Sequence, residues 1–284
     1  MRIGGKARWY AELLTKKDAE DACSFARSKK IPLIVLGGGS NTIFADGVIA
    51  ALVVRIQSEN MTMENSNGRR TRIVVGAGKP LGCLVNNLAV NNLDLSALTG
   101  IPGTVGGAIF GNAGQGASGI WIDYFVESVT AYVDGRWKIF TRDECKFRYR
   151  DSAFKTCAYA SRQVIIWEIA LSIPSRQEAD VKMEIERLLK KRIETQPHLK
   201  TAGSCFKSLS DGTPAWQLIA GAGLRGEKIG GVQISEKHAN FLMNTDNGTF
   251  DDVKAVIGLV KKTAPRIEGV EMRLYGEDGA NLWQ

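Results

Sequence analysis

The stretch from Ala97 to Gly114, ALTGIPGTVGGAIFGNAG, is the feature that most constrains how this chain can fold. It holds six glycines among small and apolar residues, with one proline and no charged side chain. A backbone without Cβ atoms can adopt positive φ and come within contact distance of a ligand, so dense glycine favours main-chain N–H groups that face an anion or a polar cofactor. A glycine-rich turn packed on its own core is the alternative. The close spacing, with Thr104 and Asn112 able to add side-chain hydrogen bonds, favours ligand binding.

A second glycine loop, Gly37–Asn41 (GGGSN), directly follows the apolar run PLIVL. A junction of this kind, from strand to loop, is typical of phosphate-binding sites. The loop lacks the GK[ST] ending of a P-loop, so no lysine is placed to reach a β- or γ-phosphate, and hydrolysis of a nucleoside triphosphate is disfavoured. The diphosphate bridge of a larger cofactor fits, because backbone N–H groups and the side chains of Ser40 and Asn41 suffice for it.

A third glycine motif, Gly76–Gly82 (GAGKPLG), comes close to the dinucleotide-binding fingerprint of a Rossmann fold. It lies between a predicted strand and a predicted helix, and Asp94 follows at about the distance of an acid that binds ribose. However, its third glycine comes one residue late, and hairpins and short strands surround it in place of repeated βαβ units. We therefore expect a turn that lines a cofactor groove.

The remaining pattern mixes helices and strands and predicts the α+β class. Periodicity predicts helices over 16–29, 177–194 and 250–262, and strands over 49–56, 128–133, 137–140 and 164–171. Asn67-Gly68 and Asp134-Gly135 are hairpin signals. With a boundary at Pro174, we expect a first domain over 1–174, with subdomains of about 1–56 and 57–174, and a second domain over 175–284 whose last strand returns to the active site.

Charge and cysteine content narrow the classes of partner. The net charge is +7, but lysines and arginines alternate with acids, and the densest basic cluster, 187–192, is best explained as a solvated helix surface. Five cysteines without a CxxC pair and only two histidines disfavour a zinc site and a disulfide framework, and we expect no metal. No signal segment or long apolar run is present. We expect a cytoplasmic monomer without a nucleic-acid or membrane partner.

Six motifs occur in the order found in the UDP-N-acetylenolpyruvoylglucosamine reductase (MurB) family of bacterial peptidoglycan synthesis, which the chain resembles over essentially its whole length. They are IPLIVLGGGSN, LTGIPGTVGGAIFGNAG, YRDSAF, AGSCFK, LIAGAGLRGEKIGGVQISEKHANFLMN and EMRLYG. The resemblance implies an FAD-binding module of the vanillyl-alcohol-oxidase/PCMH type with two subdomains, and a C-terminal α+β substrate-binding domain. It also implies that NADPH reduces bound FAD, and that hydride then passes to UDP-N-acetylglucosamine enolpyruvate to give UDP-N-acetylmuramate.

The resemblance assigns site residues by their place in these motifs. The FAD-binding set is Gly37, Gly38, Gly39, Ser40, Asn41, Ile101, Pro102, Gly103, Thr104, Gly106 and Gly107. The catalytic set is Arg150 for the substrate carboxylate, Ser204 as proton donor and Glu271 in support of an enol-like intermediate. Tyr149, Lys207 and Lys237 are assigned to substrate, the lysines to the UDP diphosphate, with Gln196 and Asn240 as weaker candidates and His238 as a structural residue. Without the resemblance, we would interpret Arg150 as a surface ion-pair partner, Ser204 as a turn residue and Glu271 as a solvated strand position.

Several departures from the family pattern bear on these assignments. Ser208 replaces an asparagine that contacts substrate, and Lys79-Pro80 replaces an aromatic residue. The chain starts directly at its first glycine turn, so a flavin contact from an earlier segment is not expected, and the short spacing from YRDSAF to AGSCF resembles the form without an inserted substrate loop. Two other functions stay open: an FAD-dependent oxidase or dehydrogenase of another sugar or alcohol, and a non-catalytic UDP-sugar binding protein.

Overall fold

The computed structural model describes residues 1–66, 68–114, 119–160, 162–197, 200–267 and 269–282. The chain divides into two compact units, each built from separate stretches of sequence. Unit 1 comprises Met1–Trp9, Gly39–Ala51 and Lys191–Gln284, and unit 2 comprises Tyr10–Gly38 and Leu52–Lys190. The domain ranges 1–174 and 175–284 stay predictions.

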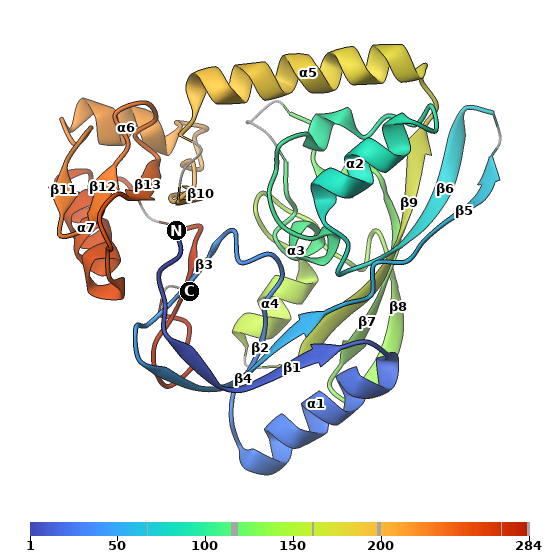
Figure 1. Ribbon diagram of the computed structural model, residues 1–284, viewed down its shortest axis with the longest axis horizontal. Coiled ribbons are helices and arrows are strands. Elements are labelled where there is room, and N and C mark those ends of the chain that lie inside the picture. The colour runs from blue at the N-terminus through green and yellow to red at the C-terminus, as the bar shows by residue number, and fades with distance from the viewer. Residues whose placement is uncertain (67, 115–118, 161, 198–199, 268, 283–284) are drawn as a thin grey trace. The chain divides into compact units, whose positions relative to one another are not determined.

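Unit 2 contains a five-stranded antiparallel sheet (Figure 1). Its strand order is β5 (Met61–Ser66), β6 (Arg70–Gly76), β9 (Val164–Pro174), β7 (Val126–Val133) and β8 (Arg136–Thr141). The central strand β9 is a run of apolar residues that is almost wholly buried. Between β7 and β8, Asp134 and Gly135 both have positive φ, +47° and +88°, as a tight hairpin turn requires. This hairpin is confirmed, whereas Asn67 of the other hairpin signal lies outside the described residues.

The helices of unit 2 begin where local capping signals place them. Helix α1 (Lys16–Lys29) has the predicted bounds, opens with a capping box between Thr15 and Asp18, and buries its alanine face. Further α-helices and short helices follow before α5. They are α2 (Leu81–Ala89), η1 (Ser96–Leu98), α3 (Val105–Phe110), η2 (Ile122–Tyr124) and α4 (Ala153–Tyr159). Apolar side chains of α2 and α3 form one buried cluster with those of β6, β7 and β9. This cluster supports the glycine-rich stretch, which contains α3.

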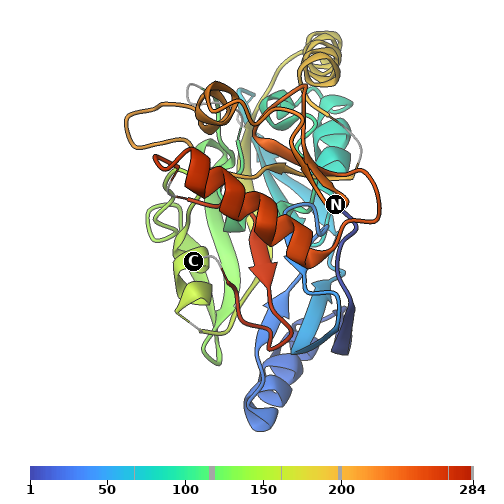
Figure 2. The ribbon, with the colours of Figure 1, turned by 90° about the vertical axis from the view of Figure 1, so that its left-hand side faces the viewer.

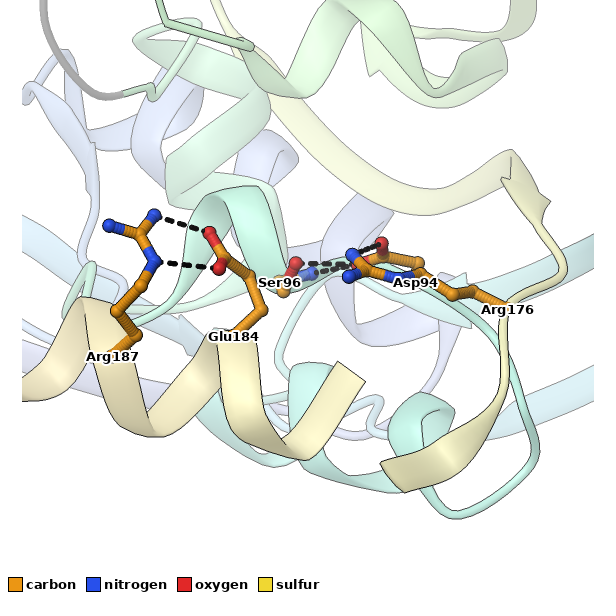
Figure 3. A network of polar contacts seen from close by, with 5 residues as sticks. All are labelled: Asp94, Ser96, Arg176, Glu184 and Arg187. Atoms are coloured by element: carbon orange, nitrogen blue, oxygen red, sulfur yellow. Dashed lines mark hydrogen bonds and ion pairs between the residues drawn. The ribbon is translucent and has the colours of Figure 1, made fainter. Parts of the chain in front are cut away.

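The strand before the third glycine motif rules out a dinucleotide-type βαβ unit there. Strand β6 lies between β5 and β9 and is antiparallel to both. Asp94 is also committed elsewhere, as Figure 3 shows: it accepts hydrogen bonds from the backbone and hydroxyl of Ser96 at 2.9 and 2.6 Å, and from Arg176 at 2.9 Å. Burial opposes ionisation of Asp94, but these hydrogen bonds outweigh it and lower its pKa. The interpretation against a Rossmann site is therefore confirmed.

The network in Figure 3 continues onto α5 (Glu178–Thr195), where Arg187 makes two hydrogen bonds to Glu184, at 2.8 and 2.6 Å. This helix agrees with the one predicted over 177–194, and only some of its apolar side chains are buried. Val181 and Ile185 are buried, whereas Leu189 is exposed.

Unit 1 contains a four-stranded antiparallel sheet covered by a helix (Figure 2). The strand order is β10 (Thr201–Ser204), β13 (Phe241–Asn244), β12 (Val232–Ile234) and β11 (Lys228–Ile229), and α6 (Ala215–Gly221) lies between β10 and β11 in the chain. Helix α7 (Phe250–Thr263) packs on β11 and β12 and buries Val253, Val256, Ile257 and Val260. Strand β14 (Arg273–Tyr275) pairs in parallel with β3 (Thr42–Phe44), so the end of the chain lies beside its second glycine loop.

A three-stranded sheet of β1 (Lys6–Leu13), β4 (Val48–Ile56) and β2 (Leu33–Val35), in that order, completes the strands. The mixture of helices and antiparallel strands confirms the α+β class. None of the described helices is both long and apolar enough to span a bilayer. Within the same residues, no group of histidine, cysteine and carboxylate side chains could hold a metal ion.

Candidate functional site

Two of the glycine loops approach each other within unit 2 so closely that no side chain fits between them. A Cβ on Gly38 would lie 2.9 Å from the Cα of Gly103, and one on Gly37 would lie 2.7 Å from Thr104 Oγ1. Gly103 has a φ of +112°, which side chains rarely allow. The glycines at 37 and 38 therefore allow close packing of the two loops, and contact of these loops with a ligand stays a prediction. We call this pair of loops, Gly37–Gly38 and Gly100–Gly107, the cradle.

The structure corrects one expectation for the glycine-rich stretch: its middle is a helix and not a loop. Thr104 caps α3 at its first turn, with Oγ1 accepting a hydrogen bond from Gly107 N at 3.2 Å. The threonine hydroxyl thus stabilises the helix start. Ile101 and Pro102 lie in the described segment that leads into this cap.

The third glycine motif packs against the cradle at the start of α3. Ala77 O accepts a hydrogen bond from Gly106 N, and Lys79 O accepts one from Val105 N, both at 2.9 Å. A Cβ on Gly106 would lie 2.8 Å from the Cβ of Ala77. These contacts fix the position of α3, so the glycine-rich turn at 76–82 contributes packing to the cradle.

The YRDS motif forms a tight turn that is attached to the far end of the same glycine-rich stretch. Arg148 and Asp151 exchange backbone hydrogen bonds at 3.1 and 3.2 Å, and Tyr149 and Arg150 lie at the tip between them. Asn112 Nδ2 donates to the Arg148 carbonyl at 3.0 Å. Asn112 is therefore committed to holding this turn, in place of the ligand contact that the sequence suggested.

Arg150 combines an unusual backbone with an aromatic contact. Its φ is +54°, in the left-handed region that residues with a Cβ seldom occupy. Its guanidinium carbon lies 4.9 Å from the ring centroid of Trp121, and the Tyr149 ring meets Trp121 edge-on at 5.4 Å. Trp121 itself packs so closely on Gly114 that a Cβ there would lie 2.6 Å from the indole. Sequence analysis missed Trp121, since no motif or spacing connects it with Arg150.

In unit 1 the segments that carry Ser204 and Glu271 are neighbours. Glu271 N donates to the Cys205 carbonyl at 2.8 Å, and Phe206 and Val270 form the next bridge. Both side chains of the predicted pair are partly exposed. Burial raises the pKa of the Cys205 thiol between them to about 12, so this cysteine stays protonated and unreactive.

Asn240 holds the Ser204 segment in place by acting as a substitute strand partner. Its amide accepts from Phe206 N and donates to Phe206 O, both at 2.9 Å, while its own carbonyl accepts from Cys205 N at 2.9 Å. Asn240 therefore has a structural role, and a contact with substrate stays a prediction. His238 supports it, with Nδ1 accepting from Asn240 N at 3.3 Å, and burial lowers the pKa of this histidine.

Asn41 connects the second glycine loop to the Glu271 segment. Its Nδ2 donates to the Glu271 carbonyl at 3.3 Å, and its own carbonyl accepts from Arg273 N at 3.0 Å. Within the described part of the chain, its Oδ1 is buried and has no hydrogen-bond donor. A buried acceptor left unsatisfied is costly, so the geometry fits a donor supplied by a ligand. Gly39, with a φ of +65°, and Ser40 precede it in unit 1.

The two lysines assigned to substrate, Lys207 and Lys237, each make a hydrogen bond within the protein. Lys237 Nζ donates to the carbonyl of Ile193 near the end of α5. Lys207 is half-buried, and its backbone N–H donates to Gly269 O at 2.9 Å. Of the catalytic set, Arg150 belongs to unit 2, and Ser204 and Glu271 belong to unit 1. The roles of all site residues stay predictions.

The cradle of unit 2 fits the cofactor that the sequence resemblance implies. A long dinucleotide such as FAD needs closely approaching backbone for its diphosphate. In unit 2, Gly38 and Gly103 supply backbone without side chains.

Comparison with known proteins gives matches at both the sequence and the structural level. Residues 8–137 match the profile of the FAD binding domain, and residues 196–274 match the profile of the UDP-N-acetylenolpyruvoylglucosamine reductase C-terminal domain. A UDP-N-acetylenolpyruvoylglucosamine reductase of Aquifex aeolicus is 34% identical over 100% of this chain and 94% of its own. One from Synechococcus sp. is 33% identical over 95% and 86%. The crystal structure of MurB from Thermus caldophilus superposes with a TM-score of 0.78 at 28% identity, over 93% of this chain and 91% of that chain.

Proposed function

The chain belongs to the UDP-N-acetylenolpyruvoylglucosamine reductase family, and from that premise we propose that Arg150, Ser204 and Glu271 act on one substrate. The protein is an FAD-dependent oxidoreductase that uses NADPH to reduce UDP-N-acetylglucosamine enolpyruvate to UDP-N-acetylmuramate in peptidoglycan synthesis. When bound, FAD supplies the hydride chemistry between NADPH and the enolpyruvyl double bond. The chain's own residues hold the substrate and move the proton.

The proposed role of Arg150 is to bind the substrate carboxylate and to stabilise the negative charge that develops beside it. A guanidinium offers paired N–H donors that match a carboxylate. The left-handed backbone of Arg150 and the contact with Trp121 fix the direction of this side chain within unit 2. Removing one such donor costs about 3 kcal/mol of transition-state stabilisation.

The proposed role of Ser204 is to donate a proton to the carbon that has become carbanionic. A hydroxyl is a weak acid in water, but it can protonate a carbon base when the two are held at hydrogen-bond distance. Glu271, on the neighbouring segment, would stabilise the enol-like form by hydrogen bonding. The backbone bond from Glu271 to Cys205 supports this pairing, because it places the two residues on adjacent segments.

The single observation that carries the proposal is the full-length match to the reductases. The backbone hydrogen bond between Glu271 and Cys205 supports the pairing of Ser204 with Glu271. The substrates we propose as its partners are the enolpyruvyl sugar nucleotide and NADPH. We also propose a monomer that acts in the cytoplasm. Light scattering coupled to size-exclusion chromatography tests the oligomeric state.

The experiment separates the two half-reactions of the purified yellow enzyme by stopped flow. With Ser204→Ala, we expect NADPH to reduce the flavin at the normal rate, while formation of UDP-N-acetylmuramate falls by at least about a hundredfold. Ser210→Ala, an exposed serine in the loop that follows, is the matched control and should leave both half-reactions unchanged.

Three results would contradict the proposal in different ways. Equal losses in both half-reactions would remove the proton-donor role from Ser204. Rapid reoxidation of the flavin by oxygen, with no response to the sugar nucleotide, would favour an oxidase. A colourless protein that FAD does not reconstitute, but that still binds the sugar nucleotide, would leave a binding protein.

A further inference from the structure

We propose that Lys155 is a positioning residue for Arg150, and that its ammonium group fixes the backbone from which the Arg150 guanidinium reaches the substrate. This inference rests on the function proposed above for Arg150. Lys155 is the last residue of the motif stretch Tyr149–Lys155, YRDSAFK, and it has no role in the reaction described so far.

The contact on which this rests is a hydrogen bond from Lys155 Nζ to the carbonyl oxygen of Arg150, at 2.8 Å. The lysine is only 6% exposed. Its ammonium also lies 5.7 Å from the ring centroid of Tyr159, one turn further along α4. The bond therefore joins the first turn of a helix to the tip of the YRDS turn.

A lysine in this place is unfavourable for two reasons that act locally. Lysine is almost never fully buried unless its charge is paired or hydrogen-bonded. Lys155 also lies in the first turn of α4, just after the Ser152 cap, where the helix dipole favours a negative charge. Lys155 meets the first condition through its bond to Arg150 O and opposes the helix dipole, and a residue that opposes a local rule is expected where function requires it.

The Arg150 carbonyl gives a reason for that requirement. Arg150 has a left-handed backbone, with φ at +54°, which is a conformation that its surroundings must impose. Two other contacts hold the base of the same turn: Asn112 Nδ2 donates to Arg148 O, and Ser152 Oγ donates to Phe110 O at the end of α3. Among these three contacts, the one from Lys155 is made to Arg150 itself, and so it determines the direction in which the side chain leaves the backbone.

The test is a double-mutant cycle on the holoenzyme with Lys155→Met, Arg150→Met and the two combined. Lys155→Met keeps the aliphatic stem and removes the donor. We expect it to slow transfer of hydride to the sugar nucleotide by about a hundredfold, the loss that a misplacement of about 1 Å can cause. Reduction of the flavin by NADPH should keep its rate, and the double variant should be no slower than Arg150→Met.

Two further measurements distinguish positioning from a general loss of stability. A crystal structure of Lys155→Met should show Arg150 outside the left-handed region, and Lys155→Arg, which keeps a cationic donor, should recover most of the lost rate. Lys146→Met, which removes an exposed lysine beside the same motif, is the matched control and should behave as the parent. If Lys155→Met does not fold, Lys155→Gln takes its place in the cycle.

The outcomes separate this inference from the proposed function. If Arg150→Met itself leaves hydride transfer unchanged, the proposed function of Arg150 is wrong. If Arg150→Met is slow but the Lys155 variant is as fast as the parent, or if the two losses simply add, the positioning role of Lys155 is wrong. An Arg150 backbone that stays left-handed in Lys155→Met would also overturn it.

Discussion

The cradle of unit 2 and the Ser204 segment of unit 1 both depend on glycine, but for different physical reasons. In the cradle, a Cβ on Gly38 would meet the Cα of Gly103, a backbone atom that cannot rotate away. Beside Ser204, Gly203 has nothing within 4 Å of the place where a Cβ would lie, but its φ is +77°. One glycine is required for space and the other for backbone conformation. A motif rich in glycine therefore predicts a special backbone without saying which of the two constraints applies.

The largest effect in this comparison is expected for Gly38→Ala. The added methyl group would lie 2.9 Å from Gly103 Cα, so the two loops must move apart. Overpacking of this kind costs about 1–3 kcal/mol of stability, and the separation removes the close backbone approach that a diphosphate needs. We expect a purified protein with little or no bound flavin, measured by its absorbance at the flavin band relative to protein. Full flavin content would show that the cradle does not hold the cofactor.

A smaller effect, confined to unit 1, is expected for Gly203→Ala. A side chain at a φ of +77° costs about 1 kcal/mol in backbone strain, although the space for it is open. The free energy of unfolding should fall by this amount in urea titrations. Flavin content should stay that of the parent, because the cradle is unchanged. A loss of flavin as large as that of Gly38→Ala would contradict the distinction between the two glycines.

Local signals in the sequence were sufficient for several elements of the fold. The helix over Lys16–Lys29 was predicted with its observed bounds because its alanine face and its charged face both lie within the segment. The hairpin at Asp134-Gly135 was predictable because two adjacent residues determine the turn. Such features need no knowledge of distant residues.

The parts of the site that sequence could not predict depend on contacts between distant segments. Trp121 lies against Arg150, and Asn240 binds the backbone of Phe206, yet no spacing in the chain connects either pair. Asn240 was expected near substrate because it belongs to a family motif. Its side-chain amide hydrogen-bonds both the N–H and the carbonyl of Phe206. The family motif thus singled out Asn240, and the fold shows which backbone groups its side chain binds.

The smallest effect is expected for Gly82→Ala, which isolates the cost of glycine itself. Gly82 is an exposed residue in the first turn of α2, without a positive φ and with nothing within 4 Å of a Cβ. Alanine restricts the unfolded chain and favours the helix, so the variant should be more stable by about 0.5 kcal/mol, with normal flavin content. Urea titration and the flavin absorbance measure both quantities. Gly82 belongs to the third glycine motif, which packs against the cradle. A gain in stability for Gly82→Ala and a loss for Gly38→Ala would show that glycine is required where the two loops approach closely. A loss of stability for both variants would show that the third motif requires glycine as well.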